Sequence, residues 1–442
     1  LLGIVVLGIG IVLSIPDKTF AGNCEVTVNN TNNTRRTCSD NETLTVGENG
    51  VISRKWKVVD TGDNNADTVI IHNYGLLRST KNTSNAISLI GSTNNTINNY
   101  SDATIQGSFR SINGTTATNL TIVNAGLIKS YDNSAYDKRA IEVTGDGFNL
   151  TNSGTIEAKS YGVKAAGDNF ILDNSGTIEA ISEDYGVSAS GDSASITNSG
   201  NITVSADNYG IRSTGADTTL INSGNITAVS LGVSIEGANQ NLTNSGNIYG
   251  TTQKAINIIG DNATITNESG GLIRAGSDGS VDGDQVNAVL FNLGNNSDYN
   301  GTLENYGTIT AAASTVKVGM ENVVINNYSG ATIQLTDDAG GTAAIQISED
   351  NATITNKGTL TGTGTASHSI EVANNITGTK IYVDGAPTFT GEIELNNAAA
   401  NTTVYLECNM SQDTTIEIHN KPNLKITNNL CGNDTYTIQD SS

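Results

Sequence analysis

The sequence predicts an all-β protein whose chain winds as a single-stranded, right-handed parallel β-helix, with about 12 or more coils of three short strands each and capped ends. Three observations predict this fold. A motif centred on asparagine recurs along much of the 442 residues, apolar residues alternate with polar ones, and turn-forming residues are in excess. A chain of this length would otherwise suggest about two or three globular domains.

Turn-forming residues dominate the composition. Asparagine accounts for 58 residues and glycine for 48, whereas proline occurs only 3 times. Glycine without proline, in a chain that is 36% hydrophobic, fits neither collagen nor a disordered tail. The formal net charge of −22 gives the chain no electrostatic attraction to a phosphate backbone, so nucleic acid is excluded as a partner.

Residues 1–21 are expected to be a secretory signal peptide. Leu1 to Ile15 are apolar, and as a helix they would span about 22 Å, short of a bilayer core of about 30 Å. Thr19 and Ala21 then supply small side chains before a cleavage point at Gly22. A membrane anchor is the alternative interpretation of this segment.

The four cysteines form two local couples, Cys24 with Cys38 and Cys408 with Cys431. An exported protein can keep such couples as disulfides, which would stabilise each end by about 3 kcal/mol. A metal site is the weaker alternative, because no CxxC pattern or nearby histidine accompanies them.

Both ends of the predicted helix need protection, because an open coil exposes unpaired strand edges. Residues 22–70, which include Trp56 and the first cysteine couple, are expected to form an N-terminal cap. Residues 374–442, where the asparagine rhythm has faded, are expected to form irregular final coils and a C-terminal cap.

Residues 71–373 are expected to hold the β-helix repeats. An Ile or Leu precedes each motif asparagine by two positions, and another follows it by four positions in nine cases and by six in three. An insertion of two residues preserves the inward face of a strand. The motif asparagines are Asn73, Asn99, Asn124, Asn152, Asn174, Asn198, Asn222, Asn244, Asn267, Asn305, Asn327 and Asn356.

A further strand completes each coil. A small residue followed by Val or Ile lies nine residues before the Ile or Leu of the next asparagine motif, as Val163 lies before Leu172. Turns such as residues 167–169 separate the two strands. One coil cannot bury its apolar face alone, whereas coils stacked at about 4.8 Å can.

The asparagines are expected to form a structural ladder. Each shares strand parity with the preceding Ile or Leu, so its side chain can turn inward at the corner of the coil. Identical amides stacked there can donate and accept hydrogen bonds along the axis. The ladder residues in the most regular coils are Asn152, Asn174, Asn198, Asn222 and Asn244.

No catalytic constellation can be assembled from the sequence. Residues 191–195 (GDSAS) resemble the GDSGS of trypsin-like proteases but fall in the register of an ordinary turn. The only histidines are His72, His368 and His419, and His72 is expected to point to solvent. We therefore predict no enzyme, no cofactor, and no catalytic, cofactor-binding or metal site.

One side of the rod is the preferred location for binding. Most length variation falls between the asparagine corner and the next strand, as at residues 130–139, and loops on a rigid scaffold commonly carry binding sites. Tyr161, Tyr185 and Tyr209 repeat in register, which fits a tyrosine ladder or a solvated face better than a carbohydrate groove.

Two acidic features are candidate cation sites. Residues 277–285 (SDGSVDGDQ) partly mimic a calcium loop, but position twelve is Val289, so an exposed acidic loop is the preferred interpretation. The weaker candidate is a set of aspartates that recur in turns, namely Asp146, Asp168, Asp192 and Asp261.

The apolar start, the repeated NSGxI segments (residues 152–156, 174–178 and 198–202) and the acidic, cysteine-poor rod together resemble the passenger region of bacterial autotransporters. The resemblance covers residues 70–360 well. It implies type V secretion through the periplasm, an outer-membrane β-barrel translocator as partner, and display at the cell surface. No run of barrel strands precedes Ser442, so residues 374–442 are expected to lead toward a missing or separate translocator.

The resemblance implies an exported adhesin or structural rod without catalysis of its own. Its expected partners are the translocator and an unidentified surface ligand, either protein or glycan. A secreted β-helical enzyme that binds or degrades polysaccharide, or a tailspike-like protein, is the alternative.

Overall fold

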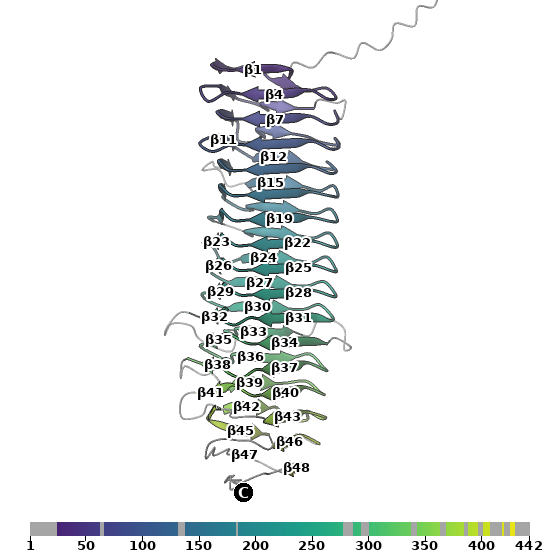
Figure 1. Cartoon of the computed structure of the whole chain (residues 1–442), viewed down its shortest axis with the longest axis vertical. Coiled ribbons are helices and arrows are strands. Elements are labelled where there is room, and N and C mark those ends of the chain that lie inside the picture. Colours follow the sequence, from purple (N-terminus) through teal and green to yellow (C-terminus); the bar gives the residue numbers. More distant parts are fainter. Residues whose placement is uncertain are drawn as a thin grey trace, which may run out of the picture.

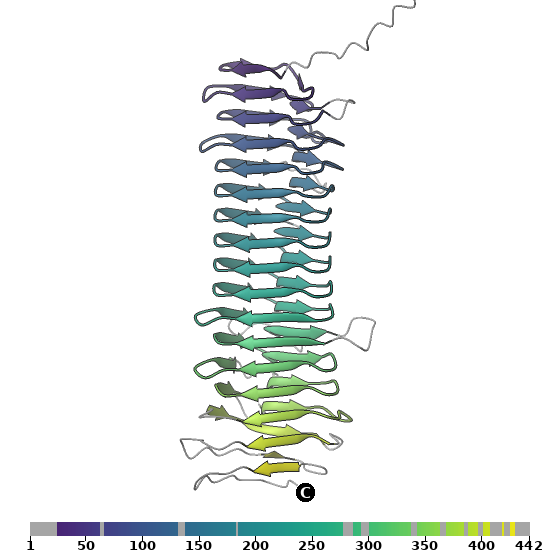
Figure 2. The same cartoon turned by 45° about the vertical axis from the view of Figure 1, so that its right-hand side comes forward.

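Three parallel sheets wind around one long axis and enclose a continuous core (Figure 1). In this computed structural model the described residues contain 48 strands and no helix, which confirms the predicted all-β parallel β-helix with three strands per coil. The coils stack at regular intervals along the rod (Figure 2). The structure describes residues 24–61, 66–130, 138–182, 184–276, 286–292, 300–336, 343–362, 368–383, 388–396, 401–406, 418–419 and 425–428.

Sheet A carries the asparagine motif. In β22 the second residue, Ile196, and the fourth, Asn198, point inward, and both align with the same positions of the neighbouring coils. The 17 strands are β1 (Val26–Val28), β4 (Thr43–Val46), β7 (Ile70–Asn73), β10 (Thr96–Asn99), β13 (Thr121–Asn124), β16 (Asn149–Asn152), β19 (Ile171–Asn174), β22 (Ser195–Asn198), β25 (Thr219–Asn222), β28 (Asn241–Asn244), β31 (Ala263–Asn267), β34 (Gly301–Asn305), β37 (Val324–Asn327), β40 (Thr353–Asn356), β43 (Lys380–Val383), β46 (Thr403–Leu406) and β48 (Lys425–Asn428).

Sheet B follows directly after the asparagine corner. Its strands alternate, with an Ile or Leu buried at the second position, as Ile156 is in β17. The 15 strands are β2 (Thr31–Asn32), β5 (Val51–Arg54), β8 (Leu76–Ser79), β11 (Thr104–Gly107), β14 (Leu127–Ser130), β17 (Thr155–Ala158), β20 (Thr177–Ala180), β23 (Asn201–Val204), β26 (Asn225–Ala228), β29 (Asn247–Gly250), β32 (Leu272–Ala275), β35 (Thr308–Ala311), β38 (Thr332–Leu335), β41 (Thr359–Thr361) and β44 (Thr388–Thr390).

Sheet C closes most coils with a small buried residue followed by an inward Ile or Val, as Ala140 precedes Ile141. The 16 strands are β3 (Arg36–Thr37), β6 (Val59–Asp60), β9 (Ile87–Ser88), β12 (Arg110–Gly114), β15 (Arg139–Val143), β18 (Val163–Ala165), β21 (Val187–Ala189), β24 (Tyr209–Ser213), β27 (Leu231–Ile235), β30 (Lys254–Ile258), β33 (Val289–Asn292), β36 (Val316–Gly319), β39 (Ala343–Ile347), β42 (His368–Val372), β45 (Glu392–Leu395) and β47 (Ile418–His419).

Each coil contributes inward residues from all three sheets to one core. In a representative coil, Leu150 of sheet A, Ile156 of sheet B and Val163 of sheet C are all fully buried. Burial of such a side chain contributes about 1.5–3 kcal/mol, and the coil gains it only when its neighbours are in place.

The solenoid extends beyond the repeat at both ends. β1, β2 and β3 pair in parallel with β4, β5 and β6, so part of the segment expected to be the N-terminal cap already forms coils. At the other end β48 pairs with β46. Residues 1–21, Cys408 and Cys431 lie outside the described residues. Within the described ranges, no helix has the length and apolar character needed to span a membrane.

A disulfide between Cys24 and Cys38 closes the first coil, with an S–S distance of 2.01 Å. The double variant C24S/C38S should free this coil locally, since a loop this short contributes about 3 kcal/mol. In a stacked repeat the loss should stay near the end. Hydrogen exchange should therefore show faster exchange in residues 24–60, with protection near Asn198 unchanged; uniform loss of protection would contradict this.

Candidate functional site

The twelve motif asparagines fill the interior and are at most 1% exposed. From Asn73 to Asn356, each Nδ2 donates to Oδ1 of the next ladder asparagine at 2.7–2.9 Å. The same nitrogen of Asn198 also lies 3.3 Å from the carbonyl oxygen of Gly200. These amides are occupied by one another and by the backbone, so they hold the fold together rather than a ligand.

The glycine two residues after the ladder asparagine is required by close approach of the backbone. A Cβ placed on these glycines would lie 2.0–2.1 Å from the carbonyl oxygen of the glycine one coil earlier. No side chain fits there, which explains why Asn-Ser-Gly recurs as a unit. The stacked glycines are Gly154, Gly176, Gly200, Gly224 and Gly246.

The turn aspartates also have a structural partner. The carboxylate oxygens of Asp146, Asp168 and Asp192 each accept a backbone N–H from the next coil, at 2.8–2.9 Å. Asp261 accepts from the N–H of Asn300 at 3.1 Å. Ser193, in the protease-like GDSAS segment, has a φ of 59° and lies in this same turn. The carboxylates therefore satisfy turn amides; the calcium-like segment 277–285 lies outside the described residues.

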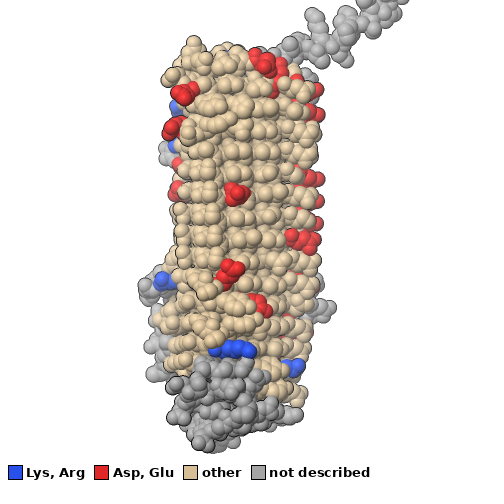
Figure 3. Space-filling model, in the orientation of Figure 1, with Lys and Arg blue, Asp and Glu red and all other residues tan. Residues whose placement is uncertain are grey.

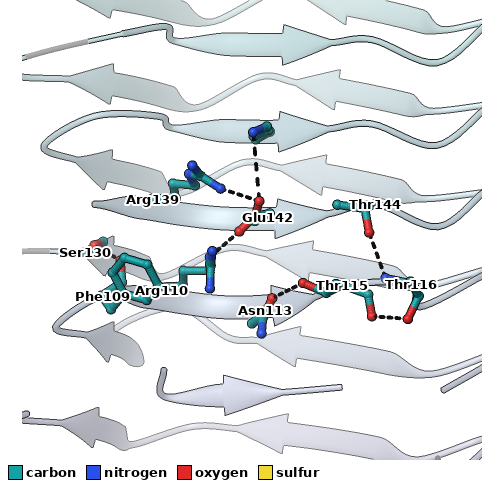
Figure 4. A network of polar contacts seen from close by, with 10 residues as sticks. Phe109, Arg110, Asn113, Thr115, Thr116, Ser130, Arg139, Glu142 and Thr144 are labelled. Atoms are coloured by element: carbon teal, nitrogen blue, oxygen red, sulfur yellow. Dashed lines mark hydrogen bonds and ion pairs between the residues drawn. The ribbon is translucent and has the colours of Figure 1, made fainter. Parts of the chain in front are cut away.

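Charged and aromatic side chains gather on the outer face of sheet C. Figure 4 shows Glu142 of β15 between Arg139 of its own strand and Arg110 of β12, and both guanidinium groups pair with its carboxylate. Lys164 of β18 lies 4.0 Å from the same carboxylate. Glu142 is only 6% exposed, and a buried charge is costly unless it is paired. Three cations from three successive coils compensate it.

Next along this face, Tyr161, Tyr185 and Tyr209 form a stack with 5.2 Å between successive ring centroids. Burial raises the pKa of Tyr185, so its phenol stays neutral over the physiological range. Arg212 donates to both oxygens of Glu236 at 2.7 Å and lies 5.6 Å from the ring of Tyr185. The three tyrosines therefore form a ladder that is bordered by an ion pair.

A pocket of about 520 Å³ opens at the corner between sheets B and C, near the N-terminal end. Successive coils contribute its walls: one lies between β2 and β3, the next between β5 and β6, and the third between β8 and β9. Trp56 lines it with 51% of its surface exposed, and Lys81 Nζ lies 3.0 Å from the centre of the indole ring. The lining residues are Arg35, Arg54, Trp56, Lys57, Thr83, Ser84 and Asn85.

The charge of this pocket is positive. Arg35 and Lys57 both pair with Asp60, which is 1% exposed. Within the described part of the chain, Arg54 Nη1 and Asn85 Oδ1 are buried without a hydrogen-bond partner. Leaving a guanidinium N–H or an amide oxygen buried without a hydrogen bond lowers the stability of the fold, unless a ligand or a water molecule supplies the missing partner.

The surroundings of the pocket differ from the rest of the rod. Residues 35–81 carry seven Lys and Arg against six Asp and Glu, whereas the whole chain has a net charge of −22. The face in Figure 3 is largely uncharged, with acidic side chains spaced along it. An anion would therefore be drawn to this end of the molecule rather than to its middle.

A second pocket, of about 560 Å³, lies at the same corner farther along the rod. Its walls come from the turns before β21, β24 and β27 and include Ser182, Asp184 and Asp207. Both pockets thus lie on the side where the sequence places its length variation. This second pocket carries acidic side chains and no described cation, so it offers nothing to an anion.

A partial signal for the first pocket is present in the sequence. Trp56, with basic residues on both sides, stands out as the single tryptophan, but its role was expected to be capping. The contributions of Arg35 and Asn85 come from the coils before and after, and no local pattern links the three. No family model, curated protein or solved structure matches the chain in comparisons with known proteins.

Proposed function

We propose that the protein is an exported β-helical rod that acts as an adhesin at the cell surface and binds acidic glycans in the pocket beside Trp56. The observation that carries this proposal is the exposed indole of Trp56 beside the cationic side chains of Arg35, Arg54 and Lys57 in one concave site. The export route rests on the apolar start and on the autotransporter resemblance.

The lining chemistry suits a sugar acid. An indole face can cover the apolar face of a pyranose ring, and a guanidinium group binds a carboxylate or sulfate through two parallel hydrogen bonds. The amide oxygen of Asn85 can accept from a sugar hydroxyl. A volume of about 520 Å³ falls within the usual range for ligand pockets.

Binding is favoured over hydrolysis by the same residues. Glycoside hydrolysis generally needs two carboxyl groups at the scissile bond. The described residues that line this pocket include no Asp or Glu, and the neighbouring Asp60 is buried and paired with Arg35. The pocket therefore offers recognition without the acid and base of a hydrolase.

A glycan array that includes uronic, sialylated, sulfated and neutral saccharides tests the proposal. We expect binding to acidic saccharides only. R54Q should weaken this binding at least about tenfold, since a hydrogen bond to a charged group contributes about 1.5–3 kcal/mol. W56A should weaken it by a similar factor, because it removes the ring that covers the sugar. R78Q is the matched control, because Arg78 is an exposed cation of the adjacent coil outside the pocket.

Two outcomes would contradict the proposal. Equal binding of neutral and acidic saccharides, or an R54Q variant that binds like R78Q, would remove the acidic-glycan site. Shortened saccharides recovered after incubation would instead support the polysaccharide-degrading alternative.

A further inference from the structure

A cluster of potential metal ligands lies on the outer face of sheet C, near the C-terminal end of the rod and far along the chain from the Trp56 pocket. His368 begins β42, and Glu392 and Glu394 lie on the next strand of the sheet, β45. One nitrogen of His368 and one oxygen from each glutamate all lie within 4.8 Å of one another. His368 Nδ1 lies 3.0 Å from Glu392 Oε1.

An irregularity in strand pairing brings these residues together. The register between β42 and β45 shifts between His368 and Ile370, where the intervening Ser369 is fully buried. A bulge of this kind re-aims the side chain beside it. As a result His368 lies opposite Glu392 on the same face as Glu394, although Ile370 points into the core.

From this geometry we propose that His368, Glu392 and Glu394 bind a zinc ion. One imidazole nitrogen and two carboxylate oxygens form a donor set that zinc accepts, whereas calcium and magnesium prefer oxygen alone. Ligand atoms about 2.0–2.1 Å from a tetrahedral zinc are roughly 3.3 Å apart. His368 Nδ1 and Glu392 Oε1, at 3.0 Å, are within a few tenths of an ångström of that separation, and rotation of the glutamate side chains can bring Glu394 closer.

The charges around the cluster favour a cation. Glu371 aligns with Glu394, so three carboxylates lie on two adjacent strands. Both oxygens of Glu371 are taken by amides, from Gln346 at 3.1 Å and from Asn396 at 3.3 Å. Glu371 is therefore a neighbour of the site rather than a ligand.

Zinc at this position would cross-link two coils. β42 and β45 are already joined by the hydrogen bonds of sheet C, and the Ser369 hydroxyl donates to the carbonyl oxygen of Glu392 at 3.0 Å. The next strand, β47, pairs with β45, and His419 aligns with Glu394 in the register of that pair. The proposed ion lies where the rod approaches its last described coils, and it would hold them to the regular part.

Isothermal titration of the full, tag-free protein with zinc chloride, and separately with calcium chloride, tests this inference. We expect one zinc ion per chain and no comparable binding of calcium. H368A and E394Q should each weaken zinc binding at least about tenfold, because even removing a group that only orients a ligand costs about 10–100-fold. Zinc should also raise the melting temperature of the unaltered protein but not of H368A.

Two variants serve as controls. E371Q removes a carboxylate of the same face whose oxygens are already occupied, and H72A removes a histidine from sheet A that contacts Tyr100 instead. Both should bind zinc like the unaltered protein. Equal affinity in H368A, or calcium binding as tight as zinc binding, would overturn the inference. Glycan binding by H368A would show that the variant is folded, and its outcome is independent of the zinc result.

Discussion

Replacing Asn198 with leucine should lower the free energy of unfolding by roughly 4 kcal/mol. Asn198 is fully buried, accepts from Asn174 Nδ2 at 2.7 Å, and donates to Asn222 Oδ1 at 2.8 Å. Leucine would leave both neighbouring amides without these partners, at about 1–3 kcal/mol each, and would crowd a packed corner. Denaturant unfolding followed by circular dichroism measures the change.

The matched control is Asn201→Leu, the same substitution three residues later. Asn201 lies on the outer face of β23, where its Oδ1 accepts only from the exposed Asn225 at 2.9 Å. An exposed substitution of this kind should change stability by no more than about 0.5 kcal/mol. Equal losses for the two variants would mean that the buried ladder contributes no more than the exposed one.

Replacing Gly200 with alanine should destabilise the protein by about 3 kcal/mol or more. The new Cβ would lie 2.0 Å from the carbonyl oxygen of Gly176 and 2.7 Å from the carbonyl carbon of Ser175. These are backbone atoms, which cannot rotate away as a side chain would. The coils would have to separate locally, which breaks packing on both sides.

Gly330→Ala separates this effect from the ordinary conformational cost of losing a glycine. Gly330 has a φ of +81°, but a Cβ there would meet nothing within 4 Å. Alanine in that conformation should cost only about 1 kcal/mol. If Gly200→Ala and Gly330→Ala lower the melting temperature equally, the Asn-Ser-Gly motif does not serve to allow close contact between coils.

The regular coils could be predicted because every rung repeats the same local choice. An Ile two residues before an asparagine places both side chains on the inner face of the strand. Because every coil repeats this spacing, the inner faces of all coils form one core. The first two coils lack the asparagine motif, because Val28 and Val46 occupy the ladder position, and Val46 aligns directly with Asn73. Valine satisfies the inward position by burial alone, so the fold continues where the motif stops.

The sites could not be predicted to the same degree, because they depend on irregular corners. Arg35, Arg54 and Asn85 line one pocket because they lie at the same corner of three successive coils. His368 reaches Glu392 through a shift in register at Ser369 that the sequence does not mark. The turn aspartates recur in a clear pattern, but strand parity does not reveal whether their carboxylates bind a cation or accept a backbone hydrogen bond. Asp168 accepts from the backbone N–H of Asp192 in the next coil.

The buried asparagine ladder also gives the rod a dipole along its axis. From Asn73 to Asn327 each Nδ2 donates to the ladder asparagine of the next coil, so the amide dipoles point the same way along the axis. Aligned dipoles reinforce one another, as peptide dipoles do in a helix. Val46 and Val383 flank the two ends of the array, next to Asn73 and Asn356. A coil could thus be added or deleted within the array, whereas one asparagine with its amide reversed would oppose two neighbours at once.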